Sequence, residues 1–133
     1  MTFEEIEQSL PNGFHDARLL EFSLDTVGKS ATVRLSLHAS VEGDSDREVY
    51  RTGDLTVRSV SLCFVEPPDA GYDFALSGKG IAVSGDPVLI GQNPAIDPVL
   101  SMLPSGLTAY RFFLEDWNSF LYICAADASF SWA

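Results

Sequence analysis

The sequence predicts an α+β domain that is mainly β, with a short N-terminal helix followed by an antiparallel sheet of about six to eight strands. Apolar residues recur at helical spacing near the N-terminus and at every second position in most later segments, and turn-forming residues separate these segments. A chain of 133 residues with 46% hydrophobic and 20% charged residues is typical of one globular domain, here residues 1–133. A meander, a sandwich or a partly open barrel would each satisfy this pattern.

The predicted N-terminal helix has a start signal and a stop signal. Thr2 stands before two glutamates, which is typical of a capped helix start, because a threonine side chain accepts bonds from the first free N–H groups. The sequence Pro11-Asn12-Gly13 then ends the helix, since proline and glycine both disfavour its continuation. The apolar face between these signals consists of Phe3, Ile6 and Leu10.

Two strands are predicted next, joined as an antiparallel hairpin. Leu20, Phe22 and Leu24 alternate with polar residues, and a second alternation runs from Val33 to Val41. The glycine-containing segment 27–30 between them has a length that hairpin turns use. We therefore expect the aliphatic side chains to face the core and the opposite face of the second strand to carry Arg34, Ser36 and His38.

The middle of the chain is predicted from apolar runs that turn residues interrupt. Residues 48–52 and 55–65 are expected to be strands, and the second has apolar side chains at both parities, which favours a central position in the sheet. Two prolines end it at 66–69. The glycine-rich segment 69–106 is expected to contain loops, short edge strands at Ile81–Val83 and Val88–Ile90, and a helical turn between Ile96 and Leu103.

The last third predicts a second hairpin. A strand is expected around Tyr110–Leu114, a turn at Asp116–Ser119, and a final strand from Phe120 to Trp132. Alternate residues of the final strand are expected on one face, because side chains in a strand repeat with a period of two. That face consists of Phe120, Tyr122, Cys124, Ala126, Ala128, Phe130 and Trp132.

Charge limits the classes of partner. Eight Lys and Arg residues against 19 Asp and Glu residues give a formal net charge of −11. Nucleic acid and anionic membranes bind proteins through Lys and Arg, so neither is expected as a partner. A basic protein is the partner that this charge would attract, and the same charge also promotes solubility. The first ten residues contain acids rather than a basic and apolar leader, so a cytoplasmic location is expected.

No cofactor or metal ion is expected. Cys63 and Cys124 each lie within an apolar run, which predicts reduced thiols in the core, and a redox pair would form only if their strands were neighbours. The two histidines, His15 and His38, do not have the spacing of a zinc site. The alternating acids at 42–48 lack the central glycine of a calcium-binding loop and fit a solvated loop better.

The adjacent pair His15 and Asp16 is the candidate for catalysis or small-ligand binding. A histidine that a carboxylate orients serves as a general base, since imidazole titrates near neutral pH. Neighbouring residues on a strand point to opposite faces, so the two side chains would converge only if one of them lay in a turn. Such a site would use Arg34 or Arg111 in addition. In the structural interpretation, Asp16 instead caps backbone donors and His15 packs beside Phe14.

Two regions are candidates for contact with a protein partner. The first is the acidic loop, whose carboxylates would attract a basic surface. The second is the aromatic C-terminal hairpin, because tryptophan is enriched at interaction hot spots, although core packing is the commoner role of such residues. The partner-binding candidates are Glu42, Asp44, Asp46 and Glu48 in the loop, and Trp117 and Trp132 in the hairpin.

The segment Leu10-Pro11-Asn12-Gly13-Phe14-His15-Asp16-Ala17, followed by two alternating strands, resembles the opening of small uncharacterised bacterial domains with a Phe-His-Asp-Ala or Leu-His-Asp-Ala corner. Some of these domains are similar to immunity proteins of polymorphic toxin systems. The resemblance covers about the first third of the chain. It implies a binding role and no established catalytic residue.

Three classes of function therefore stay open. The favoured hypothesis is a small acidic domain that binds a basic protein partner without catalysis, in the manner of an immunity protein. One alternative is an enzyme or a small-ligand pocket centred on His15 and Asp16. The other is a homo-oligomeric structural domain that associates through a strand edge or the aromatic hairpin.

Overall fold

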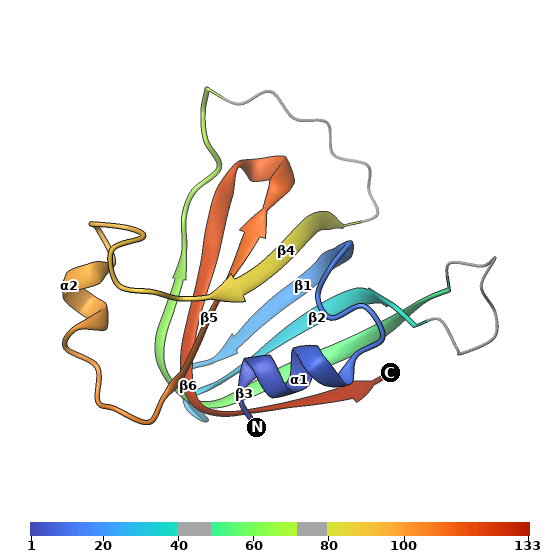
Figure 1. The fold of residues 1–133 in the computed structure, drawn as a ribbon, viewed down its shortest axis with the longest axis horizontal. Helices are drawn as coiled ribbons and strands as arrows, with labels where there is room; N and C mark the ends of the chain where they lie inside the picture. Colours follow the sequence, from blue (N-terminus) through green and yellow to red (C-terminus); the bar gives the residue numbers. More distant parts are fainter. Residues whose placement is uncertain (40–48, 72–79) are drawn as a thin grey trace.

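Six antiparallel strands close into a barrel, and one helix precedes them (Figure 1). The structure is a computed structural model that describes residues 1–39, 49–71 and 80–133. Around the barrel the strand order is β1-β2-β3-β6-β5-β4, and pairing between β1 and β4 closes it. The predicted mainly β fold with a short N-terminal helix is confirmed, and the barrel is the arrangement that forms.

The described elements follow one another in the order that the sequence pattern predicts. In chain order they are α1 (Phe3–Ser9), β1 (Ala17–Asp25), β2 (Ser30–His38), β3 (Tyr50–Val65), β4 (Ile81–Pro87), α2 (Asp97–Leu100), β5 (Thr108–Leu114), the 3-10 turn η1 (Glu115–Trp117) and β6 (Ser119–Trp132).

Helix α1 begins and packs as its sequence predicts. The Thr2 hydroxyl accepts a bond from the Glu5 N–H at 3.1 Å, and the Glu5 carboxylate accepts one from the Thr2 N–H at 2.7 Å, which forms a reciprocal capping box. Phe3 and Ile6 are fully buried, and the helix packs against β5 and β6. The N-terminal segment is thereby fixed to the barrel by its apolar face.

An aromatic cluster fills the barrel beneath α1. The Tyr110 ring stacks on Phe3 with a centroid distance of 5.2 Å, and Phe14 meets Tyr110 and Phe112 edge-on at 5.6 and 5.4 Å. The Tyr110 hydroxyl donates to the Glu7 carboxylate at 2.8 Å, and burial together with this acceptor raises the pKa of Tyr110. These four rings are completely or almost completely buried, so they join the helix, the corner after it and β5 into one core.

The first hairpin forms as predicted, but the face that β1 turns to the core differs from expectation. Strands β1 and β2 pair in antiparallel register, and Val33, Leu35 and Leu37 are fully buried. In β1 the register shifts between Leu19 and Glu21, so Leu19 and Phe22 pack against the core. Leu20 lies at the bulge and is exposed, because a bulge changes which residues of a strand face the core. Leu24 is exposed as well, near the end of the strand.

Strand β3 is one continuous strand between β2 and β6, where two strands were predicted at 48–52 and 55–65. Its predicted central position does not distinguish it, because every strand of a closed barrel has two neighbours. Its apolar residues have both parities because the inward face changes along the strand: Ser59 has a left-handed backbone, and the register shifts between Val60 and Leu62. Val57 and Val60 both contribute to the core, although they differ in parity.

The predicted single face of β6 is wrong for the same reason. Leu121, Ile123 and Ala125 point to the core in the first half, and Ala128, Phe130 and Trp132 pack against it in the second half. The change falls at Ala126 and Asp127, which are both exposed and which lie opposite the bend at Ser59 in β3. A strand that bends to close a barrel changes its inward face, which a strict two-residue alternation does not anticipate.

The glycine-rich segment is partly as predicted. Strand β4 covers the expected Ile81–Val83, and α2 lies within the expected helical turn. The prediction that this strand lies at an edge is wrong, because β4 pairs with both β1 and β5 and so closes the barrel. The edge strand predicted at Val88–Ile90 does not form. Pro87 ends β4, the Leu89 N–H donates to the Gln92 side chain at 2.8 Å, and the Leu89 carbonyl accepts from the Gln92 N–H, so this stretch closes a turn.

We expect the ion pair that joins β2 to β3 to make stability depend on pH. The Arg34 guanidinium donates twice to Asp54, at 2.8 and 3.0 Å, and this holds the pKa of Asp54 below its usual value. A lowered folded-state pKa contributes stability above the unfolded pKa of about 3.9 and loses it as the pH falls through the folded value. The Asp54→Asn variant should have a slightly lower free energy of unfolding than the unaltered protein at neutral pH, and this difference should vanish in acid. Urea unfolding at a series of pH values measures it.

The Arg34→Gln variant is the control for this prediction, because it removes the same pair from the other side. Its free energy of unfolding should also be lower than that of the unaltered protein at neutral pH, and this difference should also vanish in acid. A difference that stays constant down to strongly acidic pH would contradict the assignment.

Candidate functional site

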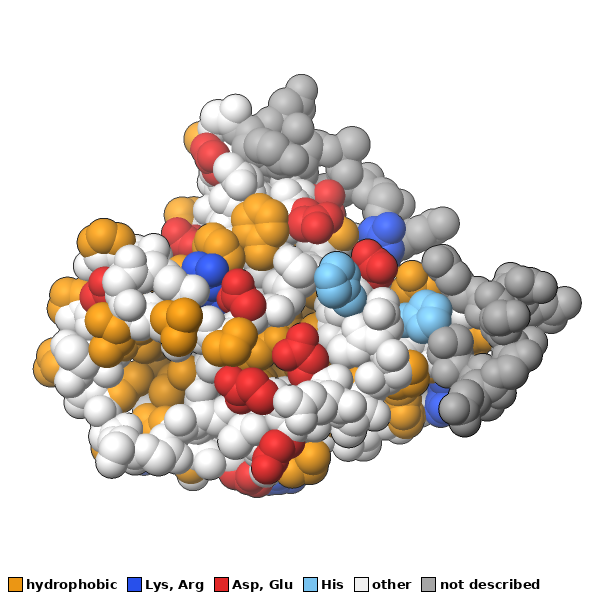
Figure 2. Space-filling view, in the orientation of Figure 1, with side chains coloured by type: hydrophobic (Ala, Val, Ile, Leu, Met, Phe, Trp, Pro, Cys, Tyr) orange, Lys and Arg blue, Asp and Glu red, His pale blue; other side chains and the backbone are white. Residues whose placement is uncertain are grey.

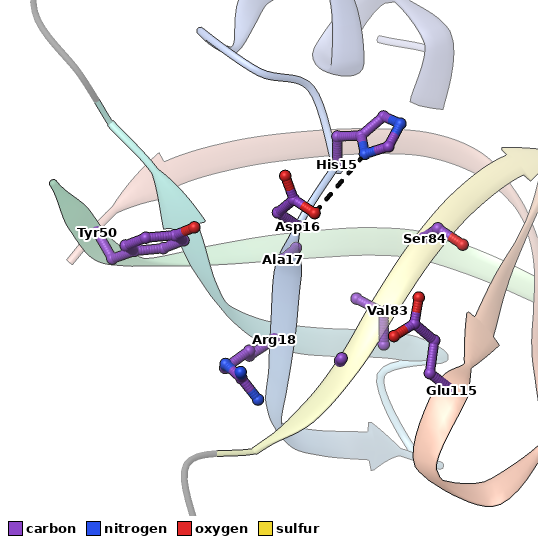
Figure 3. Close-up of a pocket in the computed structure, with 9 residues that line it drawn as sticks. His15, Asp16, Ala17, Arg18, Tyr50, Val83, Ser84 and Glu115 are labelled. Carbon is purple, nitrogen blue, oxygen red and sulfur yellow. Dashed lines mark ion pairs between the residues drawn. The ribbon is translucent and has the colours of Figure 1, made fainter. Parts of the chain in front are cut away.

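A cleft of about 660 Å³ opens where β1 and β4 meet, at one end of the barrel (Figure 3). Its lining comes from five places in the chain: the corner before β1, the start of β1, the start of β3, the middle of β4, and the turn between β5 and β6. It is lined by His15, Asp16, Ala17, Arg18, Tyr50, Ala82, Val83, Ser84 and Glu115. This cleft contains the pair that the sequence singled out, so it is the candidate functional site.

The corner before β1 holds His15 and Asp16 at the rim of the cleft. Phe14 is buried in the aromatic cluster and anchors the corner, and the His15 N–H donates to the Asn12 carbonyl at 3.0 Å. Asp16 has a left-handed backbone with φ 55°, a conformation that aspartate tolerates better than most residues. The chain then enters β1 at the buried Ala17, so the corner lies on a fixed base.

Strand register brings a cation and an anion to opposite sides of β4. Arg18 is the register partner of Ala82, while Glu115 follows Leu114, whose register partner is Val83. The small side chain of Ala82 therefore lies between Arg18 and Glu115, and Figure 3 shows these two charged side chains on either side of β4. No ion pair joins them among the residues that the structure describes.

The His15 and Asp16 pair meets the condition for convergence but not the geometry of a catalytic dyad. Both residues lie in the turn before β1, and the His15 Nδ1 atom is 3.9 Å from the Asp16 Oδ1 atom. This distance exceeds that of a hydrogen bond, and the side chains are 79% and 74% exposed. An exposed histidine that no carboxylate orients is a weak general base, whereas an exposed carboxylate readily meets a cation from outside.

The cleft as a whole is polar and has charges of both signs. The carboxylates of Asp16 and Glu115 outnumber the Arg18 guanidinium, and Tyr50 and Ser84 add hydroxyl groups. Tyr50 lies edge-on to the His38 ring with a centroid distance of 5.6 Å, which fixes the wall that β2 and β3 form. Such a lining suits the binding of a charged, hydrogen-bonding group better than the binding of an apolar ligand.

The other predicted site residues have separate positions. The acidic candidates Glu42, Asp44, Asp46 and Glu48 lie outside the described residues. Trp117 and Trp132 are half-buried and pack against the core, and Arg51 lies over the Trp132 ring at 5.0 Å. Packing thus accounts for both tryptophans, and the partner contact predicted for them stays a prediction.

Three cleft residues, Arg18, Tyr50 and Glu115, were not among the sequence-based candidates. The arginines considered as helpers, Arg34 and Arg111, do not line the cleft, since each pairs with an aspartate elsewhere on the barrel. No local motif marks the three missed residues. Their convergence follows from β1 pairing with β4, a contact between segments about sixty residues apart that alternation alone does not specify.

The two cysteines lie on neighbouring strands and face opposite sides of the sheet. Cys63 is the register partner of Ile123 and packs against the core, while Cys124 is the partner of Leu62 and is buried outside the main core cluster. Both thiols are free, and burial raises the pKa of each. The strand adjacency required for a redox pair is therefore present, but the side-chain directions prevent a disulfide without backbone movement.

No group of three or more His, Cys, Asp and Glu side chains is arranged to hold a metal ion within residues 1–39, 49–71 and 80–133. In the same part of the chain, no helix combines the length and the apolar character that crossing a membrane requires.

Searches against protein-family models, curated proteins and solved structures find no match for this chain.

Proposed function

We propose that this domain binds a basic protein partner without catalysis, and that the cleft receives a cationic side chain of that partner. The excess of carboxylates carries this proposal: the formal net charge is −11, and Asp16 and Glu115 are exposed in the cleft. Figure 2 agrees with it, since acidic side chains are spread over the face that includes α1, β4 and α2, and basic side chains are few there.

Pairing within the protein leaves this net charge unchanged but occupies three of its arginines. Arg34, Arg58 and Arg111 each lie within ion-pair distance of an aspartate, so part of the basic charge is already matched internally. Asp16 and Glu115 form no ion pair with Lys or Arg in the described part of the chain. A lysine or arginine from a partner would supply one, and the long-range field would speed the encounter.

We expect the charge-neutral variants Asp16→Asn and Glu115→Gln each to weaken binding of a short oligolysine peptide by about two- to five-fold. Asparagine also tolerates a left-handed backbone, so the first variant preserves the corner. Removing the cation from the same cleft with Arg18→Gln should strengthen binding. Fluorescence anisotropy with a labelled peptide at low and raised salt measures all three effects.

Glu21→Gln is the matched control, because Glu21 is an exposed carboxylate of β1 that does not line the cleft. It removes the same unit of charge and should have a smaller effect than either cleft variant. A peptide affinity that does not change with ionic strength would contradict the electrostatic basis of the proposal. Equal effects of Glu21→Gln and Glu115→Gln would contradict the role of the cleft.

A further inference from the structure

An apolar patch lies on the segment between β4 and β5. Leu89, Ile90, Val99 and Met102 expose 62%, 72%, 41% and 83% of their surface, and we call these four residues the α2 patch. Figure 2 shows hydrophobic side chains gathered over α2, on the same face of the molecule as the two histidines. Exposed apolar side chains that gather in this way mark interaction surfaces more often than isolated ones do.

Hydrogen bonds within the segment fix the patch. The Gly91 N–H donates to the Asp97 carboxylate at 3.0 Å, which ties the turn after β4 to the start of α2. Val99 and Met102 are three residues apart, so on a helical turn they lie on the same side. The two ends of the patch are therefore held close together in one compact segment.

The segment is also anchored to the barrel from its other side. The Asn93 side chain donates to the Tyr122 hydroxyl at 3.2 Å, and Ile96 is almost completely buried. Ile96 and Tyr122 are buried but do not belong to the main core cluster, so this segment has buried residues of its own. The platform that presents the α2 patch is thus built before any partner arrives.

We propose that the α2 patch is the docking surface for the apolar face of a cationic amphipathic helix on the basic partner. The proposal rests on the proposed function and specifies its partner. Charge complementarity selects this occupant, because the protein has a net charge of −11 and the segment between β4 and β5, residues 88–107, contains Asp97 and no lysine or arginine. An amphipathic helix presents apolar anchors at three- and four-residue spacing, and its basic residues would meet the surrounding carboxylates.

The same charge argues against two other occupants. A second copy of the chain would bring another −11 to the interface, and the two copies would repel each other. An anionic lipid surface would be repelled in the same way. The apolar side chains of the α2 patch could bind either a second copy or a lipid surface, but electrostatic repulsion opposes both. The experiments below therefore also test for self-association and for membrane binding.

The test compares two labelled peptides of about 15 residues that share one composition of leucine and lysine. One has the sequence order of an amphipathic helix, and the other is scrambled so that no apolar face forms. Their affinities for the full chain are measured by fluorescence anisotropy. The patch variant is Ile90→Ser with Met102→Ser, and the matched control is Leu24→Ser with Val27→Ser, which removes two exposed apolar side chains from the β1–β2 hairpin.

We expect the amphipathic peptide to bind more tightly than the scrambled one, and the patch variant to lose about tenfold or more of that affinity. The control variant should retain it, and circular dichroism should show that both variants stay folded. Equal affinity for the two peptides, or equal losses in the two variants, would overturn the docking surface and leave the proposed function standing. Failure of both peptides to bind would overturn the proposed function itself.

Two further measurements separate the other occupants. Sedimentation velocity reports self-association, and flotation with vesicles of anionic lipid reports membrane binding. The proposal expects neither to change in the patch variant. Loss of a dimer or of vesicle binding, with peptide binding unaltered, would assign the patch to a second copy or to lipid and would overturn the proposal.

Discussion

Replacing Phe14 with alanine is expected to lower the free energy of unfolding by about 3–5 kcal/mol, which is the usual loss for a fully buried phenylalanine. Phe14 has no exposed surface and meets the Tyr110 and Phe112 rings edge-on. Its removal leaves a cavity between the helix, the corner and β5, where the neighbouring rings cannot collapse without losing their own contacts. Urea denaturation followed by tryptophan fluorescence measures the loss.

The variant should also loosen the candidate site before the protein unfolds. The His15 N–H is bonded to the Asn12 carbonyl, and its protection against hydrogen exchange reports the order of the corner. We expect this amide to exchange faster in Phe14→Ala. Phe14→Leu is the matched control and should lose about 1 kcal/mol, since it keeps most of the apolar volume. Similar losses in the two variants would show that ring packing does not anchor the corner.

The second large effect is expected from Gly85→Ala, which should destabilise the barrel by about 1–3 kcal/mol. A Cβ atom at Gly85 would lie 2.3 Å from the Tyr110 Cε1 atom. The Tyr110 ring cannot retreat, because it is fully buried against Phe3 and its hydroxyl is bonded to Glu7. The added methyl group must therefore displace either β4 or the aromatic cluster.

Two comparisons identify the cause of that effect. Gly71→Ala should change stability little, because its Cβ would meet a single neighbouring atom at an ordinary contact distance of 3.5 Å. In a Tyr110→Ala background, Gly85→Ala should cost much less, since contacting residues couple in a double-mutant cycle. Additive effects of the two substitutions would place the strain elsewhere than between this glycine and this ring.

Local patterns in the sequence predicted the secondary structure well where one physical cause dominates. The Thr2 and Glu5 capping box, the alternation from Val33 to Leu37 and the turn before β6 all depend on neighbours within a few residues. Local patterns gave wrong predictions where closure of the barrel determines which side chains face inward. Alternation misassigned the faces of β1 and β6, because bulges and bends that curve the barrel change which parity faces inward.

The residues of the candidate site likewise differ in whether the sequence identifies them. The His15 and Asp16 pair was recognisable as an unusual doublet at a helix-to-strand corner, because both residues are adjacent in the chain. Arg18, Tyr50 and Glu115 had no such mark. Arg18 and Glu115 reach the cleft because β1 pairs with β4 and β5 ends opposite Val83. Tyr50 reaches it because β3 pairs with β2, which is the other neighbour of β1.

The amino-acid sequence by itself determined the acidic charge of this protein, its N-terminal helix, most of its strands and the apolar residues available for a core. These properties depend on residue type and on short spacing along the chain. Only the tertiary structure decided which strands are neighbours, which charged side chains share the cleft, and where apolar side chains stay exposed. Those outcomes depend on register and closure, which join residues that the chain itself keeps far apart.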